Sequence, residues 1–191
     1  ALNGQVTLSN LADFDREKRA EFAQLISLVP PEVNLHDLKS DERAAATAVS
    51  QFGFPGVCGP KITKVGALFR PCSIPVLDGH VAQAFGFTRD AFSVAAEQRS
   101  LNRRKRIAAV LDALAIGLAD HANLLLELRG RLHESVPEIS EVADLRLLDM
   151  IIWTSQDDRI TPRRSRQGPR WIERPVGDHQ SLDDFAPQPL I

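Results

Sequence analysis

A chain of 191 residues with 43% hydrophobic residues is long enough to bury one substantial core, so a single compact unit is expected. Its 23 basic and 25 acidic residues leave a formal net charge of -2, which excludes a nucleic-acid binder with a uniformly basic surface. The two cysteines, Cys58 and Cys72, cannot by themselves build a disulfide framework, a four-cysteine zinc site or an iron–sulfur cluster.

The sequence shows no pattern of a membrane or secretory protein. No apolar run approaches the roughly 20 residues that cross a bilayer. The first residues also lack the basic-then-apolar pattern of a signal peptide. We therefore expect a cytoplasmic protein without a membrane partner, and we expect a monomer.

Helical periodicity begins early in the chain. The first apolar stripe consists of Phe22, Leu25, Ile26 and Val29. It predicts a helix that begins after Asp13 or Asp15 and is stopped by Pro30-Pro31. A second helix is expected to begin at Ser40, whose side chain can cap free amides, and to end at Gly53.

Two further helices are predicted in the second half. A long one within about 101–128, with Gly117 as its weak point, carries an apolar stripe of Ile107, Leu111, Leu114, Leu118 and Leu125. The last helix should run from Ser140 to about Trp153, with Ser140 or Asp144 as its cap. Strand signals are nearly absent, so we expect an all-α fold.

The composition changes after Trp153, where arginine, proline and small polar residues replace the apolar periodicity. We therefore divide the chain into a helical domain, 1–154, and a basic, proline-rich extension, 155–191. A helix-hairpin-helix is expected at about 40–70 within the domain.

The hairpin reads Phe54-Pro55-Gly56-Val57-Cys58-Gly59-Pro60-Lys61-Ile62, and proline at position 60 suits the first turn of a new helix. Glycines let a backbone approach a phosphate closely, and amides at a helix N-terminus point towards it. The stretch therefore predicts a clamp for a nucleic-acid backbone. An ordinary tight connection between two helices is the alternative.

At these residues the chain resembles the helix-hairpin-helix superfamily of DNA glycosylases. Its pattern runs Leu-Pro-Gly-Val-Gly-x-Lys, then a helix, then an aspartate that opens the next helix. The matching positions here are Pro55, Gly56, Val57, Gly59, Lys61 and Asp78-Gly79-His80. A closer resemblance, over 59–78 and 144–149, is to uncharacterised bacterial proteins with the same hairpin.

The resemblance implies a glycosylase-like helical fold in which Asp78 supports cleavage of the N-glycosidic bond. It also implies that Lys61 is the nucleophile of a bifunctional enzyme. The hairpin, however, reads Gly-Val-Cys-Gly where the family has Gly-Val-Gly. An alignment with an insertion puts Lys61 at the lysine of the family, whereas one without a gap puts Pro60 there. Asp78 keeps its place in both.

The residues themselves make this chemistry reasonable. A carboxylate fixed at a helix N-terminus can stabilise positive charge that grows on a sugar as its base departs, and can orient the attacking water. A plain N-cap, worth about 1 kcal/mol of helix stability, is the alternative role for Asp78. Lys61 has two roles open, as a Schiff-base nucleophile or as a phosphate contact.

Backbone and basic groups around the hairpin are the expected DNA contacts, and they are Gly56, Val57, Gly59, Lys61, Lys64, Arg70, His80, Arg103 and Arg104. Part of the basic run 103–106 faces solvent in any case, because it spans every side of a helix. Trp171, in the basic stretch, is the candidate for stacking on an extruded base.

These residues lead to the hypothesis of a DNA glycosylase that flips a damaged or modified base from double-stranded DNA and hydrolyses its N-glycosidic bond. Host repair and defence against modified foreign DNA are both open. A non-catalytic DNA-binding module is the competing hypothesis, and an accessory subunit is a third. We expect no metal or iron–sulfur cofactor, although the resemblance allows a monovalent cation at the hairpin.

Overall fold

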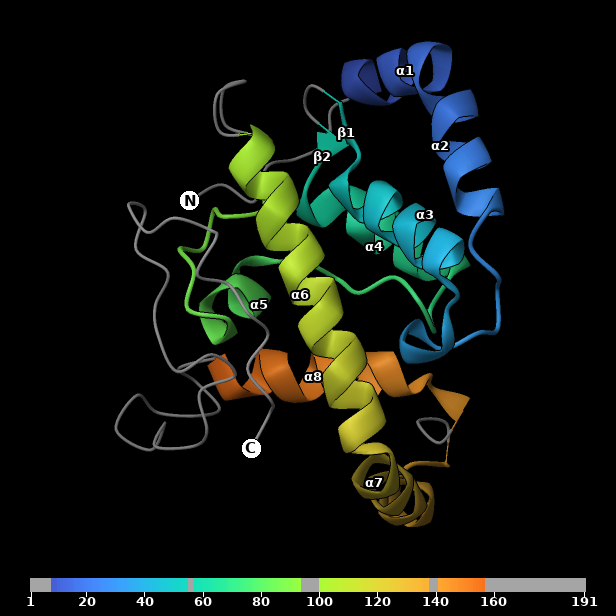
Figure 1. Cartoon of the computed structure of the whole chain (residues 1–191), viewed down its shortest axis with the longest axis vertical. Helices are drawn as coiled ribbons and strands as arrows, with labels where there is room; N and C mark the ends of the chain where they lie inside the picture. The colour runs from blue at the N-terminus through green and yellow to red at the C-terminus, as the bar shows by residue number, and fades with distance from the viewer. Residues whose placement is uncertain (1–7, 55–56, 94–99, 138–140, 157–191) are drawn as a thin grey trace.

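The computed structural model describes residues 8–54, 57–93, 100–137 and 141–156 (Figure 1). Helices account for most of them, and the one sheet among them has two strands of two residues each. The expected all-α class is therefore confirmed. Trp171 and nearly all of the expected basic extension lie outside the described residues.

Two helices form where the first apolar stripe predicted one. α1 spans Leu8–Glu17 and α2 spans Arg19–Ser27, and the backbone departs from helical geometry at Lys18. Phe22 and Ile26 of the stripe are buried, as expected. The stripe therefore marked the buried face correctly, while the break at Lys18 carried no signal from proline or glycine.

The expected bounds of the next helix are nearly right. After a short 3-10 helix, η1 (Leu35–Asp37), α3 spans Ser40–Gln51. The expected cap is wrong, because Ser40 is already helical and the Glu42 carboxylate instead accepts a hydrogen bond from the Lys39 amide at 2.9 Å. An acidic side chain in the first turn thus does the capping.

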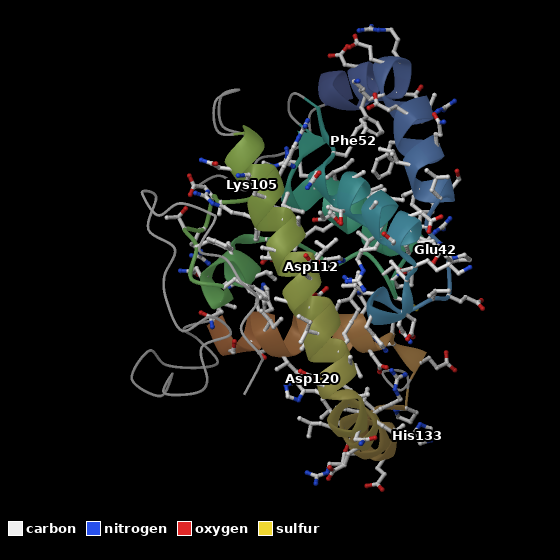
Figure 2. All side chains as sticks on the ribbon, viewed as in Figure 1. Glu42, Phe52, Lys105, Asp112, Asp120 and His133 are labelled. Carbon is white, nitrogen blue, oxygen red and sulfur yellow. The ribbon has the colours of Figure 1, made fainter. Side chains whose placement is uncertain are left out.

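The end of α3 packs against the two N-terminal helices through aromatic rings. The ring of Phe52 meets those of Phe22 and Phe14 edge to face, with centroids 5.3 and 6.3 Å apart. Figure 2 shows Phe52 directed from the end of α3 towards α1 and α2. This packing fixes the first strand of the hairpin on the core, because Phe52 directly precedes it.

A narrow hairpin joins α3 to α4 (Pro60–Phe69). β1 (Gly53–Phe54) and β2 (Val57–Cys58) are antiparallel, and Pro60 is the first residue of α4, as the sequence predicted. Beyond α4, residues 70–78 form neither helix nor strand and lead to the short helix α5 (Gly79–Ala84).

Gly59, between the hairpin and α4, faces the protein interior. Its φ of +53° lies in the region where L side chains are strained. A Cβ built there would stand 2.4 Å from the carbonyl oxygen of Phe92. The expectation that Gly59 leaves room for a phosphate is therefore wrong for this face of the residue, where the room is taken by protein backbone.

The long helix predicted within 101–128 is two helices. α6 spans Ser100–Asp120, α7 spans Ala122–Ser135, and the two are bent by 73°. The break falls at His121 and not at the expected Gly117. Among the described residues, no single helix is long and apolar enough to cross a membrane, and α6 and α7 meet that test only when joined across the bend.

The last helix, α8 (Asp144–Gln156), begins four residues later than expected. Ser140 lies outside the described residues, and Asp144 is the first helical residue rather than the cap. Its carboxylate forms an ion pair with Arg129 of α7, which ties the two helices together after the bend.

One hydrophobic core joins these elements. In Figure 1, α6 runs through the middle of the molecule, with α3 and α4 to one side, α5 to the other, and α8 crossing below. α8 packs closely on α5. The most deeply buried large side chains are Leu35, Ile62, Ile74, Leu77, Phe85, Phe92, Ile107, Leu111, Leu114, Leu118, Leu145 and Leu147.

Replacing Gly59 should test whether the hairpin depends on this close packing. Gly59→Ala should lower the free energy of unfolding by about 2–4 kcal/mol, because the methyl group meets a backbone carbonyl and φ is strained. Urea denaturation measures the loss. Gly130→Ala is the matched control, since nothing lies within 4 Å of its Cβ position on α7 and the change should stabilise the helix by about 0.5–1 kcal/mol. Equal stability of the Gly59 variant and the wild type would contradict the packing argument.

Candidate functional site

Arg103 of α6 closes the base of the hairpin from inside. Its side chain is 6% exposed, and its guanidinium donates to the carbonyl oxygens of Phe92 (2.9 Å), Gln51 (2.9 Å) and Phe52 (3.2 Å). A guanidinium held in this way cannot reach a phosphate, so the predicted DNA contact by Arg103 is wrong.

The position of Arg103 also tests whether the carbonyl oxygens at the base of the hairpin could bind the monovalent cation that the resemblance allows. The three carbonyl oxygens around Arg103 already face a positive charge, so they do not fit a further cation. Within the described ranges, no group of three histidine, cysteine, aspartate or glutamate side chains could hold a metal ion either.

Exposed cations beside the hairpin come from two helices. Lys61 is half-buried in the first turn of α4, Lys64 is exposed one turn later, and Arg104 and Lys105 are exposed on α6. The amide of the Gln51 side chain donates to the Arg104 carbonyl at 2.8 Å, so this part of α6 lies against the end of α3. Figure 2 shows Lys105 at the same end of α6. The structure thus brings Arg104 to the hairpin.

Arg70 is separated from these cations. It follows α4, about 13 Å along the helix axis from Lys61. Its guanidinium donates to the carbonyl oxygens of Val29 and Phe69, which ties the end of α4 to the chain after α2. The structure therefore gives Arg70 a role in packing, and does not bring it together with the hairpin as the sequence suggested.

Asp78 opens α5 as its N-cap. Its Oδ1 accepts hydrogen bonds from the amides of His80 (2.9 Å) and Val81 (3.1 Å), and the side chain is half-buried. The backbone of Asp78 is extended, which is the usual conformation of a capping residue. The expected position of this aspartate at the start of a helix agrees with the structure.

One hydrogen bond connects Asp78 with the hairpin helix. The amide of Leu77 donates to the Thr63 hydroxyl at 3.1 Å, and Thr63 is buried on α4. The same hydroxyl lies 3.3 Å from the carbonyl oxygens of Gly59 and Pro60. Asp78 therefore follows directly on a residue that is anchored to the first turn of α4, so the segment that leads into Asp78 packs on the hairpin helix.

His80 lies between two larger side chains. Its Nε2 is 3.2 Å from the Arg89 guanidinium, and the centroid of its ring lies 4.8 Å from that of the Trp153 ring on α8. The other ring nitrogen, Nδ1, is buried without a hydrogen-bond partner in the described structure. Trp153 therefore packs against His80, two residues after Asp78, whereas the sequence favoured Trp171 as the aromatic residue of the site.

A second carboxylate of the site was missed from the sequence. Asp149 of α8 is 9% exposed, and its Oδ2 accepts from the Val76 amide at 3.1 Å and from Arg146 at 2.7 Å. Burial raises the pKa of the Asp149 carboxyl to about 6, although Arg146 opposes the rise. Its place between Leu145 and Ile152 on the buried stripe of α8 was the signal that could have revealed it.

One protein-family profile covers all of the residues that the structure describes. The profile of a family of unknown function (DUF6308) matches residues 1–156. The chain belongs to this family. The match covers the hairpin, Asp78 and Asp149 together, so all of the site lies within the family's domain. No curated protein and no solved structure matches the chain.

The raised pKa of Asp149 predicts a pH dependence of stability. The folded carboxyl, with a pKa of about 6, holds its proton more tightly than one at the ordinary value of 3.8, so protonation favours the folded state between these values. The contribution of Asp149 is therefore fully present below pH 3.8 and is lost as pH rises through 6.

Asp149→Asn should remove this contribution. The free energy of unfolding of the wild type relative to Asp149→Asn should rise by about 2 kcal/mol as pH falls from 7 to 4. Urea denaturation of both proteins across this range measures the difference. A difference that falls as pH is lowered would show that Arg146 outweighs burial.

Proposed function

We propose that the protein is a DNA glycosylase with a helix-hairpin-helix glycosylase-like fold, which excises a damaged or modified base from double-stranded DNA. The observation that carries the proposal is the hydrogen bond from Leu77 to Thr63, which joins the segment of Asp78 to the first turn of the hairpin helix. A backbone clamp and a fixed carboxylate in one place are what base excision requires.

Asp78 supplies the chemistry in this proposal. One oxygen is held by two helix amides, so the carboxylate has a defined direction without being part of a buried ion pair. Its negative charge would stabilise the oxocarbenium character of the sugar as the base leaves, and would orient the water that attacks the sugar carbon. The ring of Trp153, close to His80, would offer an apolar surface beside the extruded base.

Lys61 and the exposed cations Lys64 and Arg104 hold the DNA backbone in this proposal. Lys61 also keeps the second role that the sequence left open, that of a Schiff-base nucleophile giving strand nicking. Either host repair or defence against modified foreign DNA would provide the substrate.

A non-catalytic DNA-binding module is the second candidate. It is favoured by the capping geometry of Asp78, because an Oδ1 that accepts from two amides is also what a purely structural N-cap would show. Under this alternative, the carboxylate stabilises α5 and the exposed cations alone account for function.

Asp78→Asn separates the two candidates. The amide oxygen of asparagine can still accept from the His80 and Val81 amides, so α5 should stay folded while the charge is lost. Base release should fall by about 100-fold or more, and affinity for duplex DNA should hold or increase, because a charge that repels phosphate is removed. The assay uses duplex oligonucleotides that each carry one base of a panel, such as uracil, hypoxanthine, 8-oxoguanine, ethenoadenine and hydroxymethyluracil, followed by alkaline cleavage of abasic sites.

Asp120→Asn is the matched control for this charge change. Asp120 is exposed at the end of α6, far from the hairpin in Figure 2, and its replacement should leave base release unchanged. Full activity of Asp78→Asn would rule out the proposed mechanism. Release of no base by the wild type, together with duplex binding, would favour the non-catalytic module.

The two roles of Lys61 can be distinguished by comparison with Lys64. If both lysines contact phosphate, Lys61→Gln and Lys64→Gln should each make the slope of log K against log salt concentration shallower by about 1. Each variant should retain base release. Filter binding on an undamaged duplex at several salt concentrations gives the slopes. Loss of strand nicking and of borohydride trapping in Lys61→Gln alone would instead identify Lys61 as the nucleophile.

A further inference from the structure

Asp149 is a buried carboxyl group close enough to the capping Asp78 to interact with it electrostatically. Oδ2 of Asp149 accepts from the Val76 amide and from Arg146, while its Oδ1 is buried and has no hydrogen-bond partner in the part of the chain that the structure describes. Two charged groups act on this carboxyl from its surroundings, Arg146 on the same helix and Asp78 at the start of α5.

The segment that carries Asp78 is held in place by side chains from two helices. Arg146 of α8 donates to the carbonyl oxygens of Pro71 (3.2 Å) and Ile74. Further along this segment, the Val76 amide donates to Asp149 of α8 and the Leu77 amide donates to Thr63 of α4. Asp78 is the following residue, so α8 and α4 together determine where its carboxylate stands.

The ion pair with the largely buried Arg146 accounts for the charge at position 149, and the hydrogen bond from Val76 accounts for its place in the site. The oxygen of a neutral asparagine could accept from Val76 at a much smaller cost of burial than an ionised carboxylate. The charge does have an effect on the site, because Asp149 and Asp78 interact electrostatically. The charge of an ionised Asp149 is paired with Arg146 at 2.7 Å, so its main effect on the site is to hold the Val76 amide and the chain that leads into Asp78.

We propose that Asp149 is a positioning residue for Asp78, which fixes the chain leading into the capping carboxylate by binding the Val76 amide. This inference rests on the proposed glycosylase function and deepens it, since it names a second carboxylate that acts through the first. Arg146 completes the arrangement by holding the chain upstream of Val76 and by pairing with Asp149 when it is ionised.

Amide NMR of the full chain tests the coupling without any DNA. Between pH 4.5 and 8, the amide of Val76 should shift with a midpoint near the pKa of Asp149, about 6, and the amides of His80 and Val81 should follow with the same midpoint. In Asp149→Asn these shared transitions should disappear.

Asp144→Asn is the matched control, because Asp144 is the other acidic residue near the buried side of α8 and pairs with Arg129 instead. It should leave the three amide titrations unchanged. A Val76 transition that the His80 and Val81 amides do not share would overturn the inference. If Asp149→Asn does not fold, the wild-type titration alone decides.

The effect of Asp149 on catalysis is measured with the oligonucleotide of the panel that loses its base. At pH 7.5, Asp149→Asn should lower kcat by about 10-fold and leave the Kd for DNA within about 2-fold, because the residue acts on Asp78 and not on the phosphates. Its pH profile should lose the acid limb that the wild type shows near the pKa of Asp149. If Asp149→Asn keeps the kcat of the wild type while Asp78→Asn loses base release, only the role of Asp149 is overturned. If the wild type releases no base, the proposed function itself is overturned.

Discussion

The contact between Arg103 and the Phe92 carbonyl is the constraint on which the arrangement around the hairpin depends. The same carbonyl oxygen receives the guanidinium and lies against Gly59, so α6, the hairpin and the chain after α5 meet at one atom. The other donors of Arg103 hold the end of α3. Because this charge is buried, its loss would leave three carbonyl oxygens without donors, which costs more than a surface hydrogen bond.

The segment that leads into Asp78 is held in part by side chains of α4 and α8 instead of by the hydrogen bonds of a helix or sheet. Residues 70–78 belong to no helix or strand. Some of their backbone groups pair with other backbone groups, while those of Ile74, Val76 and Leu77 are bound by the side chains of Arg146, Asp149 and Thr63. Burying a charged pair for this purpose stabilises a protein less than apolar packing would. What it provides is a fixed direction for the chain that leads into Asp78, and such precision is what a group acting on a transition state needs.

Helix positions and caps could be predicted from the sequence, whereas the bend between helices and the long-range contacts of individual side chains could not. The bounds of α3 follow from short-range patterns and lie within two residues of those in the structure, and the place of Asp78 at the start of a helix follows from the resemblance and agrees with the structure. The bend at His121 escaped prediction because the apolar stripe continues through it, from Leu118 to Leu125. Arg103 was assigned to DNA because a basic run looks the same whether it faces solvent or carbonyl oxygens. Asp149 was overlooked although a charge on an apolar stripe is a visible anomaly.

The sequence separations of these contacts have a consequence for the order of folding. Thr63 and Leu77 are 14 residues apart, whereas Val76 and Asp149 are separated by 73 residues. Closing the longer loop requires α8 to be synthesised and docked first, and such non-local contacts form slowly. During synthesis the hairpin and α5 can therefore collapse early, but Asp78 acquires its final surroundings only when nearly the whole matched domain has left the ribosome. A fragment that ends before α8 would therefore hold Asp78 at the start of α5 without the contacts from Asp149 and Arg146 that fix the preceding residues.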